Sequence, residues 1–99
     1  MLMITVNTES AIIALRLDGR LAGSHAHELA RTRRAVGFKR PYETVLFDLT
    51  EVTAIDDVGK EFLAQAHSNG DRLIAGAVTR AIIDEIVSRS GSESKRGSS

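Results

Sequence analysis

Cysteine and tryptophan are absent from this 99-residue chain, proline occurs once, and aromatic residues make up 4% of it. Without cysteine, neither a disulfide framework nor a thiolate metal site can form, which fits a reducing cytoplasm. No apolar run approaches the roughly 20 residues that a transmembrane helix needs. The N-terminus also lacks the basic flank and apolar block of a signal peptide. We therefore expect a soluble cytoplasmic protein with no membrane partner.

An excess of charge of one sign is also missing, because 13 basic residues balance 13 acidic ones. A net charge of zero gives no general reason to expect binding to nucleic acid or to an anionic membrane. Locally the charge is uneven, since residues 24–42 are rich in arginine and lysine and residues 43–61 in aspartate and glutamate. Two readings stay open: two solvated faces, or a dipolar surface that orients a partner.

The hydrophobic fraction of 42% is enough for one core in a chain of this length. From Ser88 onward the sequence holds only serine, glycine and charged residues. Such a segment cannot bury enough surface to offset the entropy of ordering it. We predict a single domain, residues 1–89, followed by a disordered tail, residues 90–99.

Four short apolar segments predict the β-strands, namely Met3–Asn7, Ala11–Leu17, Val45–Leu49 and Arg72–Ala75. The short link between the first two implies an antiparallel hairpin, and the later alternation of strands and helices implies parallel strands. Since Val45–Leu49 shows no polar alternation, we expect it to be covered on both faces. The predicted fold class is α/β, with a mixed, mostly parallel four-stranded sheet and about three helices in the order ββαβαβα.

Helix boundaries follow from capping residues and glycines. The first helix should open at Ser24, a candidate N-cap, and stop at Gly37. The second should be capped by Asp56 or Asp57, and the third should begin near Thr79. Asp18-Gly19 should end the second strand, because glycine is free to take positive φ there.

Three segments occur in an order and spacing typical of one family. They are LDGRLA at residues 17–22, VLFDL at 45–49 followed by VTAID at 52–56, and LIAG at 73–76. Over roughly Met3–Arg89 the chain resembles a STAS domain, the family that includes bacterial anti-sigma factor antagonists. The resemblance implies a β/α superhelix and a non-enzymatic module that binds a partner protein in bacterial signalling or transcriptional regulation. That partner would be an anti-sigma factor or a kinase-like regulator.

The family's motif at the second helix is Asp, then Ser or Thr, then a small residue, then Gly. Asp56 and Gly59 match it, but Asp57 occupies the phosphoacceptor-equivalent position and Val58 follows. Asp57 has no hydroxyl, so the usual phosphorylation cannot occur there. Its carboxylate is either a partial mimic of a phosphate, with one charge against about 1.5–2, or a helix cap, and the two roles are compatible.

We predict that the start of the second helix and the loop before it bind the partner. The predicted partner-binding residues are Thr53, Asp56, Asp57, Val58, Gly59 and Lys60. Two other classes remain as alternatives. One is a small-ligand or nucleotide-binding module, or an enzyme subunit, that uses the same end of the sheet. The other is a structural protein that self-associates through its first strand, so a homodimer is possible.

Catalytic and cofactor signatures are missing from the sequence. His25 and His27 lie two apart, on nearly opposite sides of a helix, so they cannot share a metal. Asp48 with Asp56 and Asp57 lacks the further acids and the lysine of a phosphoaspartate site. No Gly-x-Ser-x-Gly elbow and no phosphate-binding glycine loop is present. We expect a non-enzyme without cofactor or metal that does not bind nucleic acid.

Overall fold

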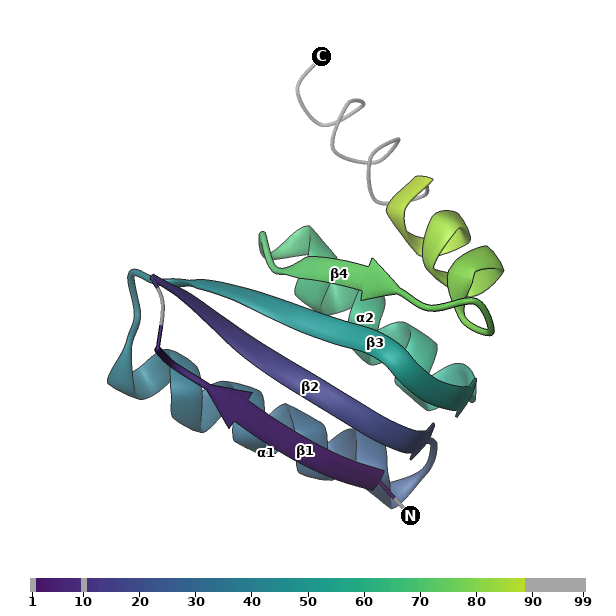
Figure 1. Ribbon diagram of the computed structural model, residues 1–99, viewed down its shortest axis with the longest axis horizontal. Helices are drawn as coiled ribbons and strands as arrows, with labels where there is room; N and C mark the ends of the chain where they lie inside the picture. Colours follow the sequence, from purple (N-terminus) through teal and green to yellow (C-terminus); the bar gives the residue numbers. More distant parts are fainter. Residues whose placement is uncertain (1, 10, 89–99) are drawn as a thin grey trace.

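The computed structural model describes residues 2–9 and 11–88 (Figure 1). The labelled elements are β1 (Leu2–Asn7), β2 (Ile12–Leu21), α1 (Ser24–Lys39), β3 (Thr44–Ile55), α2 (Asp57–Ser68) and β4 (Arg72–Ala75). Residues 80–88 form a further helix, yellow-green in Figure 1, which we call the C-terminal helix. The described part therefore has the predicted order ββαβαβα, and the predicted tail, residues 90–99, lies outside it.

The four strands form one sheet in the order β1-β2-β3-β4. β1 runs antiparallel to β2, whereas β3 runs parallel to both β2 and β4. The prediction of a mixed, mostly parallel sheet is thus confirmed. The two long strands β2 and β3 lie at its centre, and β1 and β4 are its edges.

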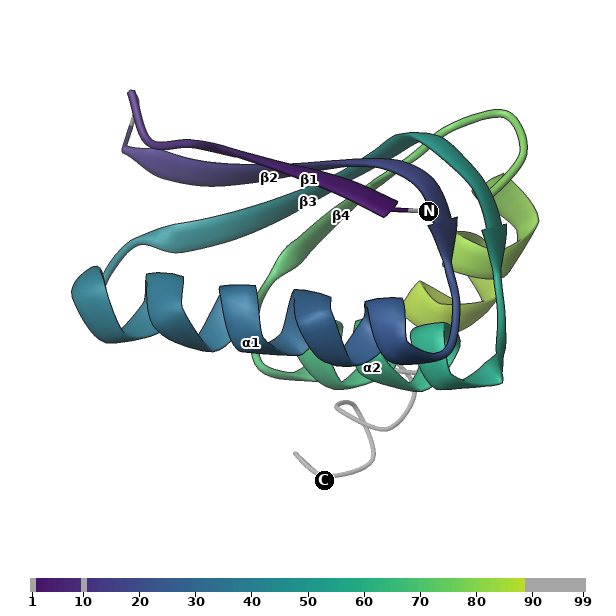
Figure 2. The same cartoon turned by 90° about the horizontal axis from the view of Figure 1, so that it is seen from below.

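The helices cover one face of the sheet, as Figure 2 shows with α1 and α2 beneath the strands. Along β3, Val45, Phe47 and Leu49 are buried, whereas Leu46 and Asp48 between them are only half-buried. The expectation that this strand is covered on both faces is therefore wrong. The strand does alternate with period two between the face that the helices cover and the opposite, open face. The sequence does not show this alternation, because Leu46 on the open face is also apolar.

Both central strands are longer than predicted, since β2 continues to Leu21 and β3 to Ile55. Asp18-Gly19 does not end β2. The pairing with β3 shifts register on both sides of this dipeptide, and Gly19 has a φ of 111°. Bulges of this kind bend a strand and increase its twist. In Figure 2, both strands curve down at this end toward the starts of α1 and α2.

The helix α1 begins at Ser24 as predicted, but its predicted N-cap and its predicted end are wrong. Gly23, not Ser24, occupies the N-cap position, and no side chain caps the helix there. The helix also passes through Gly37 to Lys39. Gly37 makes room for a neighbour instead of ending the helix, because a Cβ there would lie 2.7 Å from the Nη1 atom of Arg33.

Side chains of α2 and of the loop before the C-terminal helix anchor both elements to β3. The rings of Phe47 and Phe62 meet edge to face, with centroids 5.6 Å apart. Thr79 is fully buried, and its hydroxyl accepts a hydrogen bond from the Gly76 N–H at 3.0 Å and donates one to the Leu49 carbonyl at 3.4 Å. The start of the C-terminal helix is thereby fixed near the centre of the sheet.

Candidate functional site

The start of α2 is held by the carboxylate of Asp56, the N-cap residue. One carboxylate oxygen accepts a hydrogen bond from the Gly59 N–H at 2.8 Å, and the other accepts one from the Gly23 N–H at 2.8 Å. The Asp56 N–H donates to the Leu21 carbonyl at 3.2 Å. These bonds join the start of α2 to the turn that precedes α1. The hydrogen bond from Gly59, followed by that from Gly23, lowers the pKa of Asp56 because both favour the charged form.

Gly59 lets α2 lie directly against the end of β2. A Cβ on Gly59 would lie 2.7 Å from the Leu21 carbonyl oxygen and 2.9 Å from Cγ2 of Ile55. Both distances are shorter than real carbon contacts allow, so only glycine fits without a shift of the helix. The glycine of the predicted motif is therefore explained by close packing, since a helical glycine needs no unusual φ.

Residues after the cap point outward. Asp57 is exposed in the first turn of α2, and Val58 keeps 42% of its surface exposed although it is apolar. Lys60 is half-buried and Glu61 is exposed. We call these four residues the α2 surface. Asp57 does not cap the helix, so the capping role considered for it belongs to Asp56 alone.

Of the predicted site residues, five lie together at the start of α2, but they divide into two kinds. Asp56 and Gly59 position the helix, whereas Asp57, Val58 and Lys60 are presented at its surface. Thr53, the sixth, lies in β3, where its exposed hydroxyl donates to the Gly19 carbonyl at 3.2 Å.

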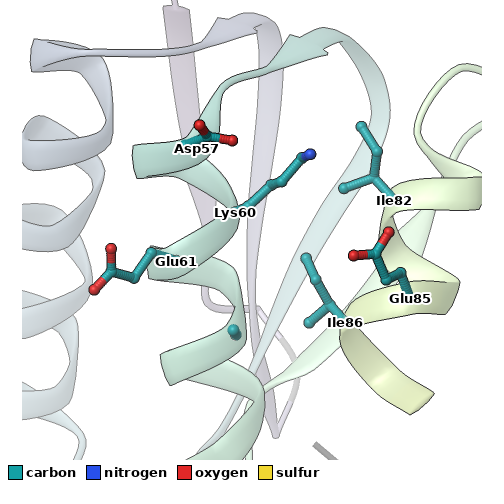
Figure 3. Close-up of a pocket in the computed structure, with 7 residues that line it drawn as sticks. Asp57, Lys60, Glu61, Ile82, Glu85 and Ile86 are labelled. Carbon is teal, nitrogen blue, oxygen red and sulfur yellow. The ribbon is translucent and has the colours of Figure 1, made fainter. Parts of the chain in front are cut away.

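A groove runs beside the α2 surface, between α2 and the C-terminal helix (Figure 3). Its volume is about 460 Å³. Ala64, Ile82 and Ile86 provide its apolar lining, and charged side chains provide the rest, namely Asp57, Lys60, Glu61 and Glu85. In Figure 3 the Lys60 side chain extends from α2 toward Ile82, whereas Glu61 points away toward α1. A second hollow of about 280 Å³ lies between α1 and α2 and includes Val58 and Glu61 in its wall. The α2 surface thus forms a ridge between two hollows.

Sequence reasoning missed Gly23, Glu61 and the groove beside α2. One signal was available, because Asp57, Glu61 and Ala64 follow each other at helical spacings of four and three and so share a face. Gly23 could not have been found this way. Its bond to Asp56 joins residues 33 apart and depends on where two strands end.

Within the described residues, no group of three or more histidine, aspartate or glutamate side chains is placed to hold a metal ion. No helix in this part of the chain is long and apolar enough to cross a membrane.

No protein-family model matches the chain, and no curated protein does. Among solved structures, an uncharacterized protein of the DUF3478 family from Shewanella loihica PV-4, described as having a SpoIIAA-like fold, matches with a TM-score of 0.52. The match covers 86% of this chain and 93% of that one, at 9% sequence identity. The chain has a SpoIIAA-like fold. This is the STAS fold that the sequence predicted.

The STAS fold of this chain also matches part of a larger protein. A crystal structure of Mglu aligns with a TM-score of 0.58 and 24% identity over 72% of this chain. The chain spans only 18% of the Mglu chain. The two matches show that this fold occurs both as nearly a whole chain and as a small part of a long one.

Proposed function

We propose that this chain is a non-catalytic protein–protein interaction module of the STAS type, which binds its partner through the α2 surface. The observation that carries the proposal is the arrangement at the start of α2. Asp56 and Gly59 fix the helix rigidly, and the next residues present a carboxylate, an exposed valine and an ammonium group to solvent. Interfaces combine an apolar centre with a polar rim in this way.

The partner class that we propose is an anti-sigma factor or a kinase-like regulator in bacterial signalling or transcription, as the sequence resemblance implies. Control by phosphorylation at the usual place is not part of the proposal, because Asp57 has no hydroxyl. We propose that its constant negative charge keeps the module in one binding state. The amount of complex would then depend on the abundance of the partner alone.

The test is a crosslinked pull-down from lysate of the source cells, read by mass spectrometry. The baits are the native chain, Asp57→Lys on the α2 surface, and Arg72→Glu as a matched control on the open face of the sheet. We expect one protein to be enriched by the native and Arg72→Glu baits and lost with Asp57→Lys. Equal enrichment with all three baits, each confirmed as folded by circular dichroism, would contradict the proposal.

Once the enriched partner has been purified, its affinity for variants of Asp57 can separate the effect of the charge from the effect of side-chain shape. Asp57→Asn keeps the size of the side chain and removes its charge, whereas Asp57→Glu keeps the charge. If the charge sets the binding state, Asp57→Glu should bind about as well as the native chain and Asp57→Asn should bind at least several-fold more weakly or more tightly. Identical affinities for all three would show that the carboxylate has no such role.

A further inference from the structure

Two of the chain's aromatic side chains lie almost entirely in solvent at one end of α1. Phe38, in the last turn of the helix, is 89% exposed, and Tyr42, in the loop after it, is 98% exposed. Large exposed apolar groups gathered in one place mark binding surfaces. Phe38 has no role in the core, so its position calls for another explanation.

Unpaired cations surround Phe38. Arg33 and Arg40 are neutralised by Asp71 and Glu43, but three other basic residues of α1 are exposed and form no ion pair within residues 2–9 and 11–88. These are Arg31, Arg34 and Lys39. Together with Phe38 they line a shallow hollow of about 350 Å³. We call these four residues the aromatic–basic end of α1.

The complement to this surface is present in the same molecule. The α2 surface carries the carboxylates of Asp57 and Glu61 and one cation, Lys60, beside the exposed Val58. The groove of about 460 Å³ that runs along it adds the carboxylate of Glu85 and the apolar side chains of Ile82 and Ile86, so carboxylates outnumber cations there. In Figure 2, α1 ends at the left of the helical layer and α2 starts at its right. The α1 end of one copy can therefore contact the α2 start of a second copy while the α2 start of the first copy stays free.

We propose that the aromatic–basic end of α1 in one copy docks on the α2 surface of a second copy, head to tail. Phe38 enters the groove between α2 and the C-terminal helix, and Arg31 and Arg34 approach Asp57 and Glu61. Such a contact joins two different surfaces, so it can continue to a third copy or close into a ring. It covers Asp57, and self-association therefore competes with any other protein that binds the α2 surface.

A second copy fits the aromatic–basic end better than a nucleic acid or a membrane does. Three unpaired cations are few for a phosphate backbone, whose binders make many such contacts, and fewer than the 4–8 of lipid-binding clusters. The charge pattern and the exposed apolar group are instead matched by the excess of carboxylates and by the isoleucine side chains of the groove. The inference shares a surface with the proposed function but needs no foreign partner.

The first test is sedimentation velocity of the purified full chain over a wide range of concentration, at low and high salt. We expect a mass that rises with concentration and rises less at high salt, since the attraction between exposed charges is screened. Arg34→Glu and Phe38→Ser should each reduce this rise strongly. Arg72→Glu and Met3→Ser, matched changes on the open face of the sheet, should leave it unchanged.

Mixing two defective variants gives the decisive result. A chain with Arg31→Glu and Arg34→Glu keeps its α2 surface, and a chain with Asp57→Lys and Glu61→Lys keeps its α1 end. Each should sediment as a single chain, whereas the mixture should form a complex of one copy of each and nothing larger. Only a contact between two different surfaces predicts this outcome.

A native chain that stays monomeric at every concentration would overturn the inference. So would an association that Arg34→Glu leaves intact, which would point to pairing through the β1 edge. Neither result bears on the proposed function, because that function depends on a different protein as partner. It is tested separately by the pull-down that compares the native chain with Asp57→Lys. Conversely, a failed pull-down leaves the sedimentation result standing.

Discussion

At the scale of single residues, two adjacent carboxylates have unrelated roles. Asp56 accepts two backbone hydrogen bonds and is part of the structure, whereas Asp57 is exposed and free to meet a partner. The sequence predicted a cap at one of the two but could not decide which. That choice depends on where β3 ends, and the strand ends six residues later than its apolar run suggested.

The first prediction concerns Asp56 and pH. Because its pKa is lowered on folding, its stabilising effect is present above the pKa of an unfolded aspartate, about 3.9, and is lost as the pH falls through the folded-state pKa. Asp56→Asn should therefore lower the melting temperature by several degrees at neutral pH and by less as the pH falls below about 4. Asp57→Asn is the control and should change the melting temperature little at either pH. A deficit for Asp56→Asn that does not shrink in acid would contradict the assigned role.

The second prediction concerns Gly59. In Gly59→Ala, the new methyl group would meet the Leu21 carbonyl, which is backbone and cannot move aside easily. We expect a loss of about 1–3 kcal/mol in the free energy of unfolding, the usual effect of overpacking, measured by urea denaturation. Gln65→Ala, an exposed change on the same helix, should alter it by less than about 0.5 kcal/mol. A stabilised Gly59→Ala chain would mean that helix propensity outweighs the contact.

At the scale of elements, Arg33 connects α1 to the turn before β4. Its guanidinium donates to both carboxylate oxygens of Asp71, at 2.7 and 2.9 Å, and only 6% of the Asp71 side chain is exposed. The hydrogen bonds with Asp71 raise the pKa of Arg33 further above its already high value, although burial opposes this. The guanidinium is thus charged at any pH at which the protein folds.

The third prediction tests this connection. Arg33→Met keeps the apolar stem but leaves the buried carboxylate of Asp71 without its partner, which should cost about 1–3 kcal/mol in unfolding free energy. Adding Asp71→Leu to Arg33→Met should restore part of that loss, because no unpaired charge then remains. Urea denaturation of the single and double variants measures both effects. A double variant as unstable as the sum of its single changes would show that the pair is not coupled.

Elements were predicted well where the sequence signal is local and less well where it is not. β4 has the predicted bounds, and α2 begins at the predicted place. The ends of β2 and β3 were missed because residues 18–20 and 50–54 are rich in polar residues and glycine and so resemble turns. They are held in strands by pairing with each other across the sheet.

At the scale of the whole molecule, the helices within residues 2–9 and 11–88 leave one face of the sheet open. Met3 and Ile74 on that face are 63% and 42% exposed, whereas Phe47 on the other face is fully buried. The order of elements and the α/β class could be predicted from the sequence. The number of sheet faces that helices cover could not be predicted in this way. It depends on the side of the sheet on which each connecting helix lies, and a run of apolar residues in a strand does not reveal that side.

The fourth prediction follows from this asymmetry. Ile74→Ala should change the free energy of unfolding by no more than about 0.5 kcal/mol, the usual range for exposed positions. Phe47→Ala removes a buried ring and its contact with Phe62, and should cost about 3–5 kcal/mol. Equal losses in urea denaturation would show that the open face is covered in solution.

The two hydrogen bonds of Asp56 have a consequence for the order in which the chain folds. Its carboxylate accepts from Gly59, three residues later, and from Gly23, 33 residues earlier, so it can satisfy both only after β2 and β3 have paired. An isolated α2 could gain its own cap bond but not the bond to Gly23. We therefore expect the Gly23 amide to become protected from solvent exchange only once β2 and β3 have paired.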